Sequence, residues 1–345
     1  MCQLAAYIGN QPAAPLLLES LRRQEGYFGG HATGLSTISN GRLVSVKGSG
    51  PVSKVIDGTN ILKTEGSVGI AHSRLGLSGV KDPRFNRSRN AHPFLNAENT
   101  VALIHNGVIN NYEQHWKRLK DKYVFNSYNK DINYITDSEV AVHLLNQKIH
   151  EGLDFKKALR ETAKSLTGMV LLAAISTEEP DSVYIANWIQ ACTIAKGDEE
   201  TMFSSSPLGF EHLGDEFDIF YAPYNTIIRL TRNKIRLSKL DKNRIIPKLS
   251  LDMATFRDII MEMLEERKEM TSLDIILALQ KIKDQNIFRL KSDQWENLIK
   301  IGWGDQNHII DPMLTMVNEG FVARKVEYRE EGGNSVPRII WYLSD

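Results

Sequence analysis

The 345-residue sequence contains only two cysteines, Cys2 and Cys192, so it lacks the disulfide framework of a small secreted protein. It has no apolar run near the roughly 18 to 20 residues that a membrane-spanning helix needs. Its first residues also lack the basic and apolar segments of a secretory signal peptide. Because 42 Lys and Arg residues balance 42 Asp and Glu residues, no overall charge favours nucleic acid or an anionic membrane. We therefore expect a soluble, cytoplasmic protein with no membrane partner.

The length of the chain favours two domains over one. Residues 2–240 contain many short β-like runs and central helices, whereas residues 251–345 begin with amphipathic helices. The polar segment 241–250 between them contains Pro247 and is typical of a linker. The sequence thus predicts an α+β protein with a large amino-terminal domain and a small carboxy-terminal domain.

Cys2 is a candidate nucleophile because of its position. If Met1 is removed, which the small side chain of Cys2 permits, a thiol and a free α-amine share one carbon atom. The thiolate is the reactive form of cysteine, and an α-amine with a pKa of about 7.7 to 8.0 can move its proton near neutral pH. The alternative is that Cys2 is a small apolar residue in the first strand, since free cysteine packs well.

Three more candidate residues follow predicted strands. An apolar run over 67–72 leads into Arg74, and a second run over 101–104 leads into Asn106 and Gly107. The Asn106 side-chain amide and the Gly107 backbone N–H can form an oxyanion hole. The alternative is a hairpin turn, because Asn-Gly is the dipeptide that type I′ turns favour.

Asp137 immediately precedes a predicted helix that runs from Ser138 to about His150. Thr136 and Glu139 fit a capping box, so Asp137 can be a first-turn acid that the helix dipole favours. Alternatively, its carboxylate faces a cleft and holds an ammonium group. A second helix over 155–165 lies among further strands, which favours helices stacked on β-sheets.

Taken together, these segments resemble the class II glutamine amidotransferase domain, the N-terminal-nucleophile hydrolase module of glucosamine-6-phosphate synthase and its relatives. The resemblance covers roughly residues 2–240 and rests on the joint order and spacing of several motifs. In chain order these are Met1-Cys2, Gly69–Arg74, Ala91-His92-Pro93, His105–Asn111, Thr136–Glu139 and Ser204–Leu208.

The resemblance implies a four-layer αββα fold and L-glutamine as substrate. Cys2 would attack the glutamine side-chain amide, and its α-amine would pass the proton to the departing ammonia before water hydrolyses the thioester. Asn106 and Gly107 would stabilise the oxyanion, a donor of this kind contributing on the order of 3 kcal/mol. Arg74 would bind the substrate α-carboxylate, although its alternative role is a surface ion pair. Asp137 would bind the substrate α-ammonium group, and we expect neither a cofactor nor a metal.

The sequence departs from the family pattern at three places. Gln3 follows the cysteine where many relatives have glycine, and residues 28–34 read Phe-Gly-Gly-His-Ala-Thr-Gly where synthase-like members carry Arg-Gly-x-Asp-Ser-x-Gly. After Arg74, residues 75–78 replace the usual Trp-x-Thr-His. The absent tryptophan is associated with ammonia transfer, so this departure puts the ammonia acceptor in doubt more than the amide hydrolysis.

The carboxy-terminal region resembles a winged-helix domain. Helices are predicted over 253–268, 271–282, 295–301 and 309–318, followed by strands over 321–329 and 338–343 around a loop. Residues 251–345 hold 12 Lys and Arg against 17 Asp and Glu, a balance that opposes phosphate contact. A local cluster on the wing strands still leaves nucleic acid open, beside protein docking, self-association into a homo-oligomer or a structural cap. The cluster consists of Arg324, Lys325, Arg329 and Arg338.

Three functions are compatible with this pattern. The chain lacks the sugar-binding isomerase half of glucosamine-6-phosphate synthase and the Ser-Gly-Gly-x-Asp-Ser loop of asparagine synthetase. The leading hypothesis is therefore an amidotransferase subunit that supplies ammonia to a separate synthase. The first alternative is a non-catalytic glutamine sensor with a nucleic-acid-binding winged helix. The second is a hydrolase of another γ-glutamyl amide.

Overall fold

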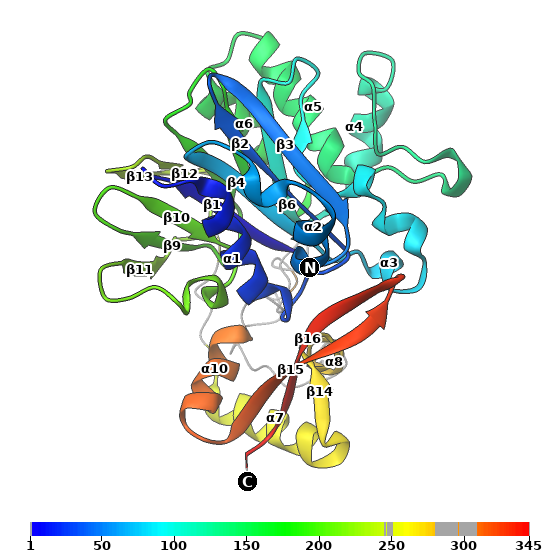
Figure 1. The fold of residues 1–345 in the computed structure, drawn as a ribbon, viewed down its shortest axis with the longest axis vertical. Coiled ribbons are helices and arrows are strands. Elements are labelled where there is room, and N and C mark those ends of the chain that lie inside the picture. Colours follow the sequence, from blue (N-terminus) through cyan, green and yellow to red (C-terminus); the bar gives the residue numbers. More distant parts are fainter. Residues whose placement is uncertain (1, 245, 247–250, 280–295, 297–308, 345) are drawn as a thin grey trace.

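Two antiparallel β-sheets packed face to face form the centre of the amino-terminal region (Figure 1). The computed structural model describes residues 2–244, 246, 251–279, 296 and 309–344. In the first sheet the spatial order is β11 (Asp218–Tyr221), β9 (Thr193–Lys196), β10 (Thr201–Ser204), β1 (Gln3–Ile8), β4 (Val68–Arg74), β2 (Ala32–Ser39) and β3 (Arg42–Ser49). In the second it is β13 (Ile235–Lys239), β12 (Thr226–Leu230), β8 (Val183–Asn187), β7 (Gly168–Ser176), β6 (Val101–Ile109) and β5 (Phe94–Leu95).

Strand β1 explains why the sheets pack as they do. Successive side chains of a strand point to opposite faces. Leu4 and Ala6 therefore join the core between the sheets, together with Ile104 of β6. Ala5 and Tyr7 face the other way and pack beneath a helix. Because both faces of β1 are covered, all six of its residues are buried, which is why the segment reads as a continuous apolar run.

Helices cover the outer face of each sheet. On the first sheet, Leu17 and Leu21 of α1 pack against Ala5 of β1. On the second, Leu145 of α5 and Leu159 of α6 belong to the core that contains alternate residues of β6 and β7. The helices of this region are α1 (Ala13–Glu25), α2 (Val52–Gly58), α3 (Leu77–Lys81), α4 (Tyr112–Leu119), α5 (Asp137–His150) and α6 (Phe155–Ser165). The layers run helix, sheet, sheet, helix, which is the predicted order.

The carboxy-terminal region forms a smaller body below the sheets in Figure 1. Its described elements are α7 (Met253–Arg267), β14 (Glu269–Thr271), α8 (Ser272–Leu279), α10 (Ile310–Asn318), β15 (Val322–Glu331) and β16 (Asn334–Leu343). Strand β16 lies between β14 and β15. The core of this smaller body includes the fully buried side chains of Phe256 and Trp341. The helix predicted over 295–301 lies outside the described residues.

The β15–β16 hairpin is longer than the sequence indicates. A loop was expected between strands ending at Arg329 and beginning at Arg338, but pairing continues to Glu331 and Asn334. Gly332 and Gly333 both have positive φ, at 56° and 78°, as a two-residue type I′ turn requires. Pro337 has no backbone N–H to donate, but β14 pairs only with residues 340–342 of β16. No hydrogen bond to β14 is therefore lost at Pro337, and the proline is tolerated.

None of the helices in the described part of the chain is both long and apolar enough to cross a membrane.

Candidate active site

The five residues predicted to act on glutamine lie together. Cys2 immediately precedes β1, and Arg74 ends the neighbouring strand β4. Asn106 and Gly107 lie in β6 of the facing sheet, and Asp137 is the first residue of α5. A cavity of about 340 Å³ is lined by Cys2, Arg74, Gly107 and Asp137, while Asn106 contacts Cys2. Arg74 and Asp137 therefore open onto the same space, as binding both charged ends of one amino acid requires.

Cys2 is partly exposed and is held by two contacts. Its backbone nitrogen donates to Asn106 Oδ1 at 3.1 Å, and its thiol Sγ lies 3.6 Å from the carbonyl oxygen of Leu75. Cys192, by contrast, is fully buried, and burial raises the pKa of its thiol. Of the two cysteines, only Cys2 therefore lines the cavity.

Asn106 and Gly107 do not form the hairpin turn that their dipeptide favours. Both lie within β6 and pair with β7, opposite Leu171 and Val170. Gly107 has a φ of 134°, and a Cβ atom there would lie 2.0 Å from the Met169 carbonyl oxygen. This position therefore requires glycine. The Gln190 side chain donates to the Asn106 carbonyl at 2.6 Å and fixes this part of the strand.

Arg74 is buried and does not form the surface ion pair that was its alternative role. Its side-chain nitrogens donate to the carbonyl oxygen of Phe85 at 3.0 Å and to the hydroxyl of Tyr134 at 3.0 Å. No acidic partner of Arg74 occurs among the residues that the structure describes. A buried guanidinium bound only to uncharged oxygens is well placed to bind an anion.

Asp137 both begins α5 and lines the cavity. Its carboxylate accepts hydrogen bonds from the backbone nitrogen of Ile109 at 2.9 Å and from Ser138 Oγ at 3.1 Å. The capping box is wrong, because Thr136 makes no side-chain capping bond and Glu139 accepts from Ser127 and Asn126 instead. The Asp137 carboxylate is thus oriented by one donor from β6 and one from its own helix.

Sequence reasoning missed Tyr134, Phe85 and the carbonyl of Leu75. The rings of Tyr134 and Phe85 also pack edge to face, with centroids 4.8 Å apart. No local pattern indicates these residues, since Leu75 and Phe85 reach the site through the segment after β4 and Tyr134 reaches Arg74 from a segment 60 residues further along the chain. Within the described ranges, no group of three or more His, Cys, Asp or Glu side chains could hold a metal ion.

Two more buried groups flank the cavity. The rings of His72 and His92 stack with centroids 3.8 Å apart, and burial holds the pKa of each imidazole well below its usual range. Both rings are therefore neutral near pH 7 and contribute shape rather than charge.

Comparison with known proteins gives one family match, described as a glutamine amidotransferase domain, over residues 82–207. This segment contains Asn106, Gly107 and Asp137 but not Cys2 or Arg74.

Several curated proteins are similar to a large part of the chain. The glutamine–fructose-6-phosphate aminotransferase of Chlorobaculum tepidum is 36% identical over 59% of this chain and 32% of its own length. The enzyme of the same name from Pseudomonas aeruginosa is 32% identical over 71% of this chain and 38% of its own length. The chain thus spans about a third of the length of these relatives.

Among solved structures, the glutamine phosphoribosylpyrophosphate amidotransferase of B. subtilis superposes with a TM-score of 0.59 at 17% identity. The match covers 74% of this chain and 52% of that one. At this identity the likeness concerns the fold alone.

Proposed function

We propose that this chain, which contains a glutamine amidotransferase domain homologous to that of glutamine–fructose-6-phosphate aminotransferase, hydrolyses the side-chain amide of L-glutamine through Cys2. The observation that carries the proposal is the cavity lined by Cys2, Arg74, Gly107 and Asp137. It combines a thiol, a buried cation and a carboxylate in one space, and these match the amide, the α-carboxylate and the α-ammonium of glutamine.

The substrate is held at both of its charged ends. The Arg74 guanidinium binds the α-carboxylate, and its hydrogen bonds to Phe85 and Tyr134 keep it in place before substrate arrives. The Asp137 carboxylate binds the α-ammonium group. Fixing the amino acid at this end places its side-chain amide near Cys2.

Catalysis starts after removal of Met1, which turns the Cys2 nitrogen into an α-amine. The amine takes the thiol proton, Sγ bonds to the amide carbon, and the amide nitrogen leaves as ammonia with the proton from the amine. Water then cleaves the thioester to glutamate. Since Oδ1 of Asn106 accepts from the Cys2 nitrogen, its Nδ2 is the half of the amide that donates to the oxyanion, together with the Gly107 N–H.

Ammonia released here passes to a separate synthase. In support, the described residues after the similar segment fold into a small unit of their own. Both alternatives stay open to test: a non-catalytic glutamine sensor, and a hydrolase of another γ-glutamyl amide.

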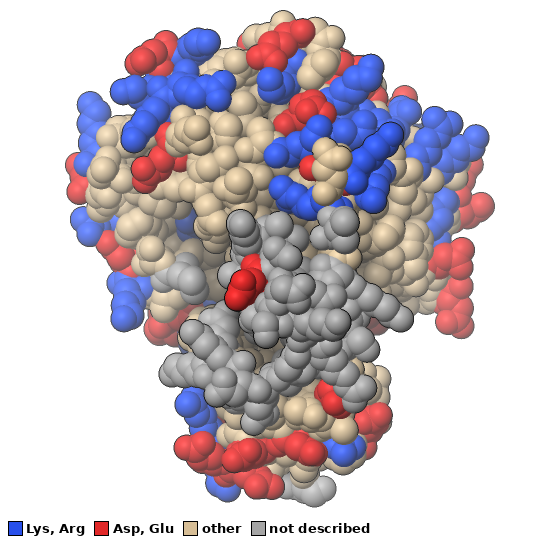
Figure 2. Space-filling model, turned by 180° about the vertical axis from the view of Figure 1, so that it is seen from behind, with Lys and Arg blue, Asp and Glu red and all other residues tan. Residues whose placement is uncertain are grey.

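The carboxy-terminal region is proposed to be a winged-helix domain over residues 251–345, joined to residues 2–240 by the segment 241–250. Its described order, α7-β14-α8 and then α10-β15-β16, supports this assignment. The domain is proposed to dock protein, either a partner or a second copy of this chain. Contact with nucleic acid is disfavoured, since acidic side chains gather at the end of the molecule where α7 lies (Figure 2). The exposed acids of α7 are Asp258, Glu262, Glu265 and Glu266.

The basic cluster expected on the wing strands is largely neutralised. Arg324 pairs with Glu211 at 2.6 Å, and Lys325 pairs with Glu269 at 2.7 Å. Arg338 is buried against Glu331 rather than exposed. A patch whose cations are already paired or buried offers little to a phosphate backbone.

The test is glutamate release from glutamine by protein whose mass confirms the loss of Met1. Wild type and a Cys192→Ala control should release glutamate, and Cys2→Ala should not. Equal release by wild type and Cys2→Ala would end the proposal. Binding of glutamine without turnover, with a glutamine-dependent shift of labelled DNA, would favour the sensor, and faster release from another γ-glutamyl amide would favour the third function.

A further inference from the structure

The tip of the β15–β16 hairpin reaches out of the carboxy-terminal region and docks beside the segment that covers Arg74 (Figure 1). The Gly332 nitrogen donates to the carbonyl of Val80 at 3.0 Å, and the Asn86 side chain donates to the Gly332 carbonyl at 3.3 Å. A Cβ atom on Gly332 would lie 2.1 Å from the Gly79 carbonyl oxygen. The contact is thus a close backbone fit with the glutamine-binding side of the amino-terminal domain.

Beside the tip, Arg338 and Glu331 form a partly buried ion pair. The Arg338 guanidinium donates to both carboxylate oxygens of Glu331, at 3.0 and 2.5 Å, and to the carbonyl of Gly29 at 3.1 Å. Burial opposes ionisation of Glu331, but hydrogen bonds from His31 and Arg338 outweigh it and lower its pKa to about 2. The carboxylate is therefore charged near neutral pH.

His31 connects this pair to the glutamine site. Its fully buried ring has Nε2 at 3.2 Å from Glu331 Oε2, and its Nδ1 accepts the backbone N–H of Gly76 at 3.3 Å. An accepting Nδ1 carries no proton, so the ring is the neutral tautomer whose Nε2–H donates to the carboxylate. The imidazole thus binds Glu331 through Nε2 and the Gly76 backbone through Nδ1.

Gly76 lies directly against the groups that would bind glutamine and the nucleophile. A Cβ atom on it would lie 2.5 Å from Arg74 Nη1. The preceding residue, Leu75, presents its carbonyl to the Cys2 thiol. A displacement of Gly76 therefore changes the space that the Arg74 guanidinium can occupy.

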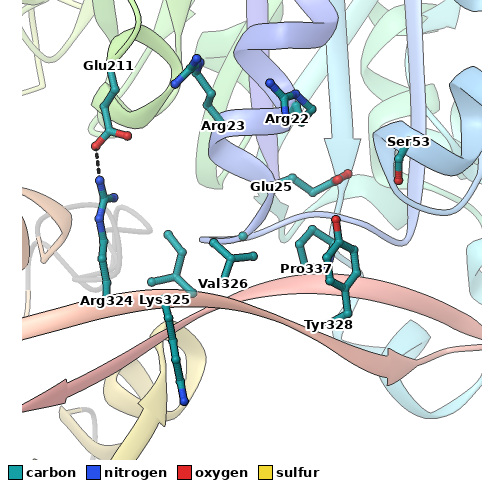
Figure 3. Close-up of a pocket in the computed structure, with 12 residues that line it drawn as sticks. Arg22, Arg23, Glu25, Ser53, Glu211, Arg324, Lys325, Val326, Tyr328 and Pro337 are labelled. Carbon is teal, nitrogen blue, oxygen red and sulfur yellow. Dashed lines mark hydrogen bonds and ion pairs between the residues drawn. The ribbon is translucent and has the colours of Figure 1, made fainter.

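The hairpin is also tied further from its tip, with a gap between the two attachments. Figure 3 shows the Arg324–Glu211 pair, which joins the hairpin to the amino-terminal region at one end of this gap. A cavity of about 440 Å³ lies between the hairpin and α1. Beside this cavity the Ile339 backbone nitrogen donates to the Gly26 carbonyl at 2.7 Å, so the polar contacts of the tip can be changed while this attachment of the hairpin remains.

We propose that Glu331, fixed by Arg338, is a positioning residue of the glutamine site, acting through His31 and Gly76 on Arg74. The carboxy-terminal domain thereby completes the substrate site of the amino-terminal domain. The expected effect on KM for glutamine rests on the proposed function. The expected effect on the position of Gly76 does not depend on turnover.

The kinetic test compares Glu331→Gln with Glu330→Gln, its exposed neighbour, in the full chain without Met1. Because a hydrogen bond to a charged group is replaced by a neutral one, Glu331→Gln should raise KM for glutamine roughly tenfold and leave kcat within about twofold. Glu330→Gln should behave as wild type. An unchanged KM for Glu331→Gln, or a fall in kcat alone, would overturn the proposal.

A second pair of variants tests docking of the tip by another route. Gly332→Ala places its Cβ against Gly79, whereas at Gly333 the nearest atom to an added Cβ is 3.5 Å away. Both positions have positive φ, so Gly333→Ala controls for turn strain. Gly332→Ala should raise KM more than Gly333→Ala, and equal KM values would count against the role of the tip.

Hydrogen exchange at the Gly76 amide separates failure of this proposal from failure of the proposed function. Glu331→Gln should speed exchange at Gly76 relative to Glu330→Gln, even if the wild type releases no glutamate. Inactive wild type with faster exchange in Glu331→Gln would reject the glutaminase and keep the structural link. Active wild type, with exchange at Gly76 unchanged in Glu331→Gln, would keep the glutaminase and reject the structural link.

Discussion

Replacing Arg74 with lysine tests how the site binds its substrate. The arginine is 6% exposed, and its donors reach two uncharged oxygens, on Phe85 and Tyr134, each at 3.0 Å. Lysine keeps the positive charge but offers a single ammonium group in place of a planar fork. It cannot satisfy both oxygens and also bind a carboxylate with two parallel hydrogen bonds.

The size of the effect follows from the bond that is lost. A hydrogen bond to a charged group contributes about 1.5 to 3 kcal/mol, and about 1.4 kcal/mol corresponds to a factor of ten in affinity. Loss of one such bond to the α-carboxylate predicts a rise of roughly 10- to 150-fold in KM for glutamine. The value of kcat should change less, because the reacting amide lies at the other end of the substrate.

The assay is steady-state glutamate release by protein without Met1, with thermal unfolding measured alongside. Arg84→Lys is the matched control, since Arg84 is half exposed and pairs with Asp82 on the surface. It should leave both kinetic constants unchanged. An unchanged KM for a folded Arg74→Lys protein would refute the assignment of Arg74 to the substrate carboxylate.

Two further predictions concern the oxyanion site and the hairpin. Gly107→Ala should lower kcat by on the order of 100-fold or more, because its Cβ would meet the Met169 carbonyl at 2.0 Å and displace the N–H donor of the oxyanion hole. The control is Gly41→Ala, which also has positive φ but has open space around an added Cβ, and it should keep the wild-type kcat. Equal kcat values for the two variants would contradict the role of Gly107. The Glu331 pKa is lowered from 4.5 to about 2, so its stabilising effect is complete above pH 4.5 and is lost as the pH falls toward 2. Thermal unfolding across this range should therefore depend less steeply on pH in Glu331→Gln than in Glu330→Gln, and identical slopes would refute the ion-pair argument.

Much of the site could be predicted because its residues stand at the ends of recognisable elements. The apolar run over 67–72 predicted a strand, and β4 delivers Arg74 at its end. The helix expected from Ser138 begins one residue earlier, at Asp137. The conformation of Asn106 and Gly107 could not be predicted from the dipeptide alone. Asn-Gly forms a turn in many sequences, but here both residues continue in β6 because they pair with β7.

The contribution of the carboxy-terminal hairpin could not be predicted. His31 and Glu331 are 300 residues apart in sequence, and neither has a local pattern that indicates the other. Arg338 was interpreted as part of an exposed basic cluster because alternation along a strand does not reveal which face another domain covers. The substitutions at residues 28–34 indicated only that a usual arginine and acid were missing there, and the structure brings Arg338 and Glu331 to this same loop.

Intact-mass analysis combined with glutamate release tests the central claim most directly. We predict that the chain lacking Met1 converts glutamine to glutamate and ammonia, that the chain retaining Met1 does not, and that Cys2→Ala is inactive in either form. Turnover by a chain that retains Met1, or by Cys2→Ala at the wild-type rate, would contradict the claim that the amine and thiol of Cys2 carry the reaction.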